Sequence, residues 1–114
     1  MADCLFCKIA AGEIPSRKVF EDDAVFAFED IQPQAPTHIL VVPKRHLATL
    51  NDLQPDDAPL AARLLLACTR IAKERGLDQT GFRLAANCLE SAGQSVFHLH
   101  IHLLGGRPLS GRLG

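Results

Sequence analysis

The sequence has no excess of charge of either sign. Its 12 basic and 13 acidic residues give a formal net charge of −1 over 114 residues, so it lacks the basic footprint of a protein that binds a nucleic-acid polymer. No apolar run is long enough to cross a bilayer. The first ten residues have neither a basic segment nor a small-residue cleavage site, which predicts no secretory signal. These absences predict a cytoplasmic protein without a membrane partner.

Disulfides are not expected in such a compartment, so the four cysteines should be reduced thiols or metal ligands. Low-complexity tracts, linkers and internal repeats are also missing. A hydrophobic content of 47% over 114 residues is sufficient for one core. We therefore expect a single domain over residues 1–114, with an irregular tail at 105–114.

Two segments predict helices. Asp3 can cap a short helix over 4–11. A longer helix is expected at about 57–75, because Pro59 is tolerated in a first turn and Gly76 supplies a stop. Residues at helical spacing give this helix an apolar face that comprises Leu60, Ala61, Leu64, Leu65, Cys68, Ile71 and Ala72.

Five segments predict strands, since they are rich in β-branched or aromatic residues and are bounded by turn residues. They are 18–22, 24–29, 37–43, 81–87 and 96–104. Short connections between neighbours favour an antiparallel meander, with the long helix packed on one face. The fold class expected from this pattern is α+β.

Three histidines, His98, His100 and His102, occupy every second position in FHLHIHLLGG (97–106). In a strand they would share one face, and together they would span about 13 Å, too far for all three to ligate one tetrahedral ion. Catalysis, with one imidazole as nucleophile or base, is therefore favoured over a metal site made by the three. The opposite face is expected in the core and comprises Phe97, Leu99, Ile101 and Leu103.

Two further motifs accompany this row. The turn AGQS (92–95) offers Gly93, Gln94 and Ser95, which suit a phosphate but also fit an ordinary turn. In CLFC, Cys4 and Cys7 lie three residues apart, so a helix places both sulfurs on one face. A redox pair has no thioredoxin-like βαβ pattern to support it. A structural metal, which needs two further ligands, and a pair of buried thiols both stay open.

The pattern His98-Leu99-His100-Ile101-His102-Leu103-Leu104 resembles the signature of the histidine triad (HIT) superfamily. Three longer blocks are similar to its branch of histidine triad nucleotide-binding proteins: CKIAAGEIPSRKVFEDD (7–23), AFEDIQPQAPTHILVVPKRH (27–46) and NCLESAGQSVFHLHIHLLGGR (87–107). The resemblance implies a five-stranded antiparallel sheet with two helices, and a homodimer whose two sheets join. It also implies hydrolysis of adenosine 5'-phosphoramidates to AMP and an amine, without a cofactor for catalysis.

The resemblance also assigns roles in catalysis. His100 matches the nucleophile that forms a nucleotidyl-histidine intermediate, and His102 matches a histidine that contacts the phosphate. Ser95 resembles the hydroxyl near the leaving nitrogen, and Gly93 with Gln94 the rest of the phosphate cradle. A fourth histidine, His38, and the first triad histidine, His98, complete the set.

The nucleoside end is assigned by the same resemblance. Asp30 matches an acid that accepts both ribose hydroxyls, and Asn87 lies where relatives carry an asparagine near the phosphate. Apolar residues that match positions flanking the purine are Phe6, Ile9, Phe28 and Ile31. Apolar residues at such spacing also fit an ordinary core.

Some bacterial relatives pair the two cysteines with two histidines, which here correspond to His46 and His98. Such a Cys2His2 set would form a structural zinc site. The tail GGRPLSGRLG differs from that of many relatives, since the sequence has no Trp, and this leaves the preferred amine open. Two alternative functions also stay open: a dinucleoside polyphosphate hydrolase of the same superfamily, and a nucleotide-binding or zinc-containing interaction protein without catalysis.

Overall fold

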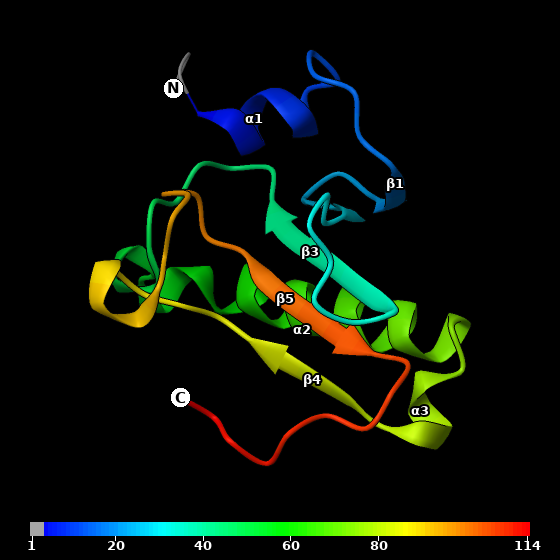
Figure 1. Ribbon diagram of the computed structural model, residues 1–114. Coiled ribbons are helices and arrows are strands. Elements are labelled where there is room, and N and C mark those ends of the chain that lie inside the picture. Colours follow the sequence, from blue (N-terminus) through cyan, green and yellow to red (C-terminus); the bar gives the residue numbers. More distant parts are fainter. Residues whose placement is uncertain (1–3) are drawn as a thin grey trace.

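The computed structural model describes residues 4–114 and contains a five-stranded sheet in the order β1-β2-β3-β5-β4, with every neighbouring pair antiparallel (Figure 1). The expected α+β class is confirmed. The strands are β1 (Lys18–Glu21), β2 (Val25–Glu29), β3 (Thr37–Pro43), β4 (Phe82–Ala85) and β5 (Ile101–Gly105). The order differs from a simple meander, because β5 lies between β3 and β4. The joining of two sheets across a dimer stays a prediction.

The helices lie on opposite faces of the sheet. The short α1 (Leu5–Ala10) and the long α2 (Ala58–Glu74) match the two expected segments, and a four-residue α3 (Leu77–Thr80) follows α2. Pro59 lies in the first turn of α2, and Gly76 adopts φ 75° just beyond its end. The expected cap Asp3 lies outside the described residues, and the Sγ of Cys4 accepts the Cys7 N–H at the start of α1. No helix within residues 4–114 is long and apolar enough to span a membrane.

Each face of the sheet has its own core. On the α2 side, aliphatic residues of β2, β3 and β5, such as Ala27, Ile39 and Leu103, pack against Leu64 and Ile71. The expected apolar face of α2 is wrong at Leu65, whose side chain is 51% exposed, as is that of its neighbour Leu66, at 65%. A second core on the α1 side contains Phe6, Ile9, Phe26, Phe28, Leu40 and Val42.

The last strand is shorter than expected, and Pro43 explains where it begins. Continuing the β3–β5 register, in which Val41 pairs with Ile101, would place Leu99 opposite Pro43. Proline has no N–H to donate to the ladder, and the Leu99 N–H donates to the Leu47 carbonyl instead, at 2.6 Å. Residues 96–100 therefore run outside the sheet. Leu99 still lies in the α2-side core, whereas Phe97, also expected in the core, is 41% exposed.

Candidate active site

His100 lies just before β5 and packs against Phe6 of α1, and its hydrogen bond defines which ring nitrogen is available. The His100 ring is buried, with its Nδ1 2.7 Å from the His98 carbonyl oxygen. A carbonyl only accepts, so in the neutral ring Nδ1 carries the proton and Nε2 keeps its lone pair. The Phe6 ring packs edge-on, with centroids 5.1 Å apart. Nε2 is thus the single nitrogen of the neutral ring that is free to accept a proton or to attack an electrophile.

A second pair of histidines forms a chain of hydrogen bonds with a defined direction. The Gln34 backbone N–H donates to Nδ1 of His38 at 2.9 Å, so a neutral His38 carries its proton on Nε2. That Nε2–H donates to Nδ1 of His102, also at 2.9 Å. The proton of His102 is then on its Nε2. The Gln34 N–H therefore fixes the tautomers of both rings. It leaves the Nε2–H of His102 as a donor that suits a phosphate oxygen.

The pKa values of these rings favour the neutral forms. Burial lowers the pKa of His38, although the Asp30 carboxylate opposes the shift. Burial, followed by the neighbouring His100 and His38, lowers the pKa of His102 to about 4. Both rings are uncharged at pH 7, as their chain of hydrogen bonds requires.

These shifts predict a loss of stability in mild acid. The folded-state pKa of His102 is about 4, whereas an unfolded histidine titrates near pH ~6.5. Between these values the unfolded chain binds more protons, so the free energy of unfolding should decrease as the pH falls from about 6.5 to about 4. Denaturant unfolding at pH 7 and pH 5 measures this. His102→Gln should show a smaller decrease, and equal decreases in both proteins would contradict the assignment.

Asp30 lies beside this pair. Its Oδ2 is 3.3 Å from Nε2 of His38, and its Oδ1 accepts the Gln32 N–H. Asp30, His38 and His102 place one potential ligand atom each within 4.8 Å of one another. The Gln34 N–H nevertheless leaves His38 Nε2 protonated, without a lone pair for a metal. These three side chains are therefore better suited to fixing the positions of the protons on the two rings than to binding a metal ion.

The turn before the histidines is arranged differently from the expectation for Gln94. Gly93 adopts φ 94°, and the Ser95 side chain is exposed. Gln94, by contrast, is only 5% exposed. Its carboxamide bonds to the backbone of Leu89, Ala48 and Val96 and is not directed to solvent.

The expected nucleobase residues have different environments. Phe6, Ile9 and Phe28 are buried in the α1-side core, where the rings of Phe6 and Phe28 meet edge to face. Ile31 is 94% exposed. Asn87 is half-buried just after β4. Of the four apolar residues, Ile31 alone offers its side chain fully to a ligand.

The two cysteines and two histidines predicted as a metal set come together. His46 Nδ1 lies 3.3 Å from Cys7 Sγ, and His98 Nδ1 lies 3.3 Å from Cys4 Sγ and 3.4 Å from Cys7 Sγ. The Nδ1 atoms of His46 and His98 are 3.2 Å apart. Neighbouring ligands of a tetrahedral zinc ion are about 3.3–3.8 Å apart, as follows from Zn–S and Zn–N bonds of about 2.3 and 2.0–2.1 Å.

The protonation of His98 also suits this set. Its Nε2 lies 2.7 Å from the Pro43 carbonyl oxygen, so Nε2–H donates and the Nδ1 lone pair faces the sulfurs. Burial lowers the pKa of His98, which favours the neutral ligand form. Burial, together with Cys4, raises the pKa of the Cys7 thiol to about 11. A cation would reverse that effect, because it stabilises the thiolate.

The backbone partners of these rings are what the sequence did not reveal. The Pro43 carbonyl, the Gln34 N–H and the His98 carbonyl each fix one imidazole. Side-chain patterns contain no signal for such groups, since every residue has a backbone. The conformation of the chain alone brings them into position.

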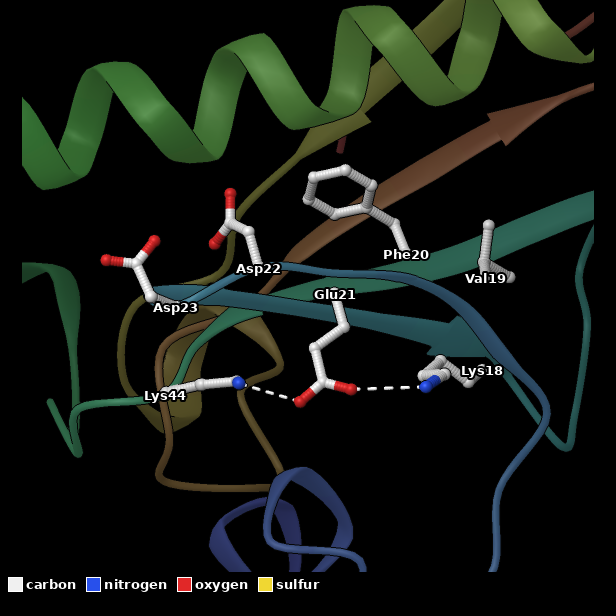
Figure 2. A pocket seen from close by; sticks show the side chains of 7 residues that line it. All are labelled: Lys18, Val19, Phe20, Glu21, Asp22, Asp23 and Lys44. Carbon is white, nitrogen blue, oxygen red and sulfur yellow. Dashed lines mark hydrogen bonds and ion pairs between the residues drawn. The ribbon is translucent and has the colours of Figure 1, made fainter.

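A separate hollow of about 540 Å³ lies at β1, where residues 18–23 and Lys44 line it (Figure 2). Glu21 lies in its centre and pairs with Lys44 at 2.7 Å and with Lys18 at 3.2 Å. Asp22 and Asp23 at its edge pair with Arg63. Each of its charged groups thus has a partner of opposite charge, and no histidine or cysteine lines it.

Comparison with known proteins places these features in a family. A family model described as the HIT domain matches residues 11–109. The purine nucleoside phosphoramidase of Escherichia coli (strain K12) is 45% identical over 107 residues, which cover 94% of this chain and 90% of that protein. Protein HitA of Neisseria gonorrhoeae is 46% identical over 105 residues, covering 92% and 97%.

Solved structures agree. The HIT family hydrolase from Legionella pneumophila Philadelphia 1 has a TM-score of 0.97 and 51% sequence identity, over 98% of this chain and 100% of that chain. A histidine triad protein from Clostridium difficile has a TM-score of 0.96 and 50% identity, over 99% and 98%. Both the sequence matches and the superpositions cover nearly the whole molecule, and the chain belongs to the HIT-domain family.

Proposed function

We propose that this protein is a purine nucleoside phosphoramidase, which hydrolyses adenosine 5'-phosphoramidates to AMP and an amine. The observation that carries the proposal is the orientation of His100, whose Nδ1–H donates to the His98 carbonyl and leaves Nε2 as the nucleophile. The similarity to an Escherichia coli protein named as a purine nucleoside phosphoramidase supports the substrate class.

The reaction proceeds in two displacements. Nε2 of His100 attacks phosphorus, and the bond from phosphorus to the amine nitrogen breaks. The ring then carries both the nucleotidyl group and its Nδ1 proton, whose positive charge the His98 carbonyl stabilises. The amine nitrogen takes a proton from solvent water through the exposed Ser95 hydroxyl as it leaves. His102 donates its Nε2–H to a phosphate oxygen.

Water completes the cycle. It attacks phosphorus, and the bond to His100 Nε2 breaks and leaves a neutral ring. The attacking water releases one proton to solvent, which replaces the proton that the amine took up in the first displacement. The Asp30 carboxylate accepts hydrogen bonds from the ribose hydroxyls. Ile31 and the residues of the α1-side core border the purine. Gly93, Asn87 and the chain around Ser95 form the phosphate side of the site, while the buried Gln94 carboxamide bonds to the backbone.

One assay separates this function from its alternatives. Release of amine from an adenosine phosphoramidate is measured beside cleavage of a diadenosine polyphosphate. Amine release that is faster than cleavage of the polyphosphate supports the proposal. Cleavage of the polyphosphate alone would indicate the dinucleoside polyphosphate hydrolase, and nucleotide binding without turnover of either would indicate the interaction protein.

We also propose that Cys4, Cys7, His46 and His98 hold a structural zinc ion. Four of the distances between their sulfur and nitrogen atoms are 3.2–3.4 Å, and all lie within 4.8 Å, which fits a tetrahedral ion. The ion would cross-link α1, the segment after β3 and the segment before β5. Its positive charge would hold these ligands together, and the other histidines would carry out catalysis.

A homodimer is the third proposal. β4 pairs with β5 on one side, and its other edge has no partner strand within residues 4–114. Half-exposed Leu65 and Leu66 on α2 add apolar surface that a second copy would cover. Sedimentation equilibrium is expected to give the mass of two chains, and a monomer at micromolar concentration would contradict the proposal. The cytoplasmic location and the absence of membrane and nucleic-acid partners stay predictions.

A further inference from the structure

The carboxamide of Gln94 is fully engaged by the backbone. Its Oε1 accepts the Leu89 N–H at 2.8 Å, and its Nε2 donates to the carbonyl oxygens of Ala48 at 2.8 Å and Val96 at 3.1 Å. A carboxamide has two N–H donors, and both are used here. With 5% of its surface exposed, this side chain has no donor left for a phosphate.

The three bonds close the segment 89–96, which we call the phosphate loop. Leu89 and Val96 are its two ends, and Gly93 and Ser95 lie between them. Leu89 adopts φ 72°, a left-handed conformation that costs energy for a residue with a side chain. Its N–H is held by the Gln94 side chain, and its carbonyl accepts the backbone N–H groups of Ala92 and Gln94.

The third bond connects the phosphate loop to the rest of the site. Ala48 belongs to the segment after β3, and its neighbour Leu47 accepts the Leu99 N–H. Leu99 lies between His98 and His100 in the chain. Gln94 and the segment that carries the nucleophile are therefore anchored to two neighbouring residues of the chain, Ala48 and Leu47.

We propose that Gln94 is a positioning residue, which fixes the Ser95 hydroxyl and the phosphate loop relative to His100 rather than contacting the substrate. The inference rests on the proposed phosphoramidase for its kinetic consequences. A direct contact with phosphate, as the sequence motif suggests, would instead contribute to binding of the ground state.

Gln94→Glu distinguishes these roles because it keeps the shape and removes both N–H donors. At pH 8 a carboxylate would face the Ala48 and Val96 carbonyl oxygens, and the loop should open. One oxygen of this carboxylate would lie beside the two carbonyl oxygens in a buried place. Their mutual repulsion raises the pKa of the introduced carboxyl group above the usual value of about 4.3. When protonated, it can donate to Ala48 and accept from Leu89, which restores two of the three bonds.

The expected result is a deficit in kcat that depends on pH. At pH 8 the kcat of Gln94→Glu should be about 100-fold below wild type, as for a catalytic group displaced by about 1 Å. At pH 5.5 the ratio of the two kcat values should narrow to within about tenfold, while KM and the Kd for AMP stay within about threefold at both pH values. Gln79→Glu, the same substitution at an exposed position of α3, is the matched control and should behave as wild type.

Two kinetic outcomes would overturn the proposal. One is a kcat ratio that does not change between pH 8 and pH 5.5. The other is an increase of about tenfold or more in KM and in the Kd for AMP with kcat unchanged, which indicates direct contact with the substrate.

Hydrogen exchange tests the positioning role without turnover. At pH 8 the Leu89 amide of folded Gln94→Glu should exchange at least about tenfold faster than that of wild type at the same pH. Equal exchange rates would refute the proposal. If wild type releases no amine, the phosphoramidase proposal fails, and the exchange rates still decide whether Gln94 holds the loop.

Discussion

His100→Ala is expected to lower kcat/KM for an adenosine phosphoramidate by about 10⁴-fold or more, since loss of a nucleophile removes the covalent route altogether. Binding should change little. The ring is buried beside Phe6, and its reactive Nε2 meets phosphorus mainly in the transition state, so the Kd for AMP is expected within about fivefold of wild type. Steady-state kinetics and calorimetric titration with AMP measure the two quantities.

Detection of the covalent intermediate gives an independent test of the same assignment. Rapid quenching of wild type during turnover should give a peptide containing residues 96–104 with the added mass of one nucleoside monophosphate, on His100. His100→Ala should give no such peptide. Turnover in the variant at a tenth of the wild-type rate or more, or an adduct on His102 in wild type, would show that another group is the nucleophile.

The strands were largely predictable because their residues alternate or are apolar throughout. The segment 37–43 was predicted with its observed bounds, and all seven of its residues are buried. The segment 96–104 was predicted too long, because its end depends on the register that places Leu99 opposite Pro43. Register joins residues far apart in the chain, and the local pattern does not contain it.

The candidate site shows the same division. The spacing of the three histidines favoured catalysis, but the single available nitrogen of His100 depends on a carbonyl two residues away. The contacts of Gln94 could not be predicted from its sequence motif. A glutamine beside a glycine suggested a phosphate contact, whereas the folded chain directs its carboxamide to Leu89, Ala48 and Val96.

The proposed metal site joins sequence and structure most directly, since Cys4 caps α1, Cys7 lies in its first turn and the other two residues come from elsewhere. The CLFC spacing placed Cys4 and Cys7 together, and the resemblance supplied His46 and His98. In the structure His98 serves both sites. Its Nδ1 faces the sulfurs, while its backbone carbonyl orients His100. Loss of the metal should therefore affect the nucleophile as well as stability.

Cys7→Ser is expected to abolish zinc binding and to lower the Tm by roughly 10–15 °C, the shift that a loss of about 3 kcal/mol produces in a domain of this size. The physical reason lies in α1, which has six residues and is too short to persist without tertiary contacts. Metal analysis of protein purified without chelator, with thermal unfolding, measures both effects.

Cys88→Ser is the matched control, because Cys88 is also half-buried and lies outside the cluster. It should retain about one zinc per chain and a Tm within about 3 °C of wild type. Less than about a tenth of an equivalent of zinc in wild type would refute the metal site. A Cys7→Ser variant with wild-type zinc content would do the same. A zinc-free Cys7→Ser variant with an unchanged Tm would show instead that the α1-side core, with Phe6 and Ile9, suffices to hold α1 on the sheet.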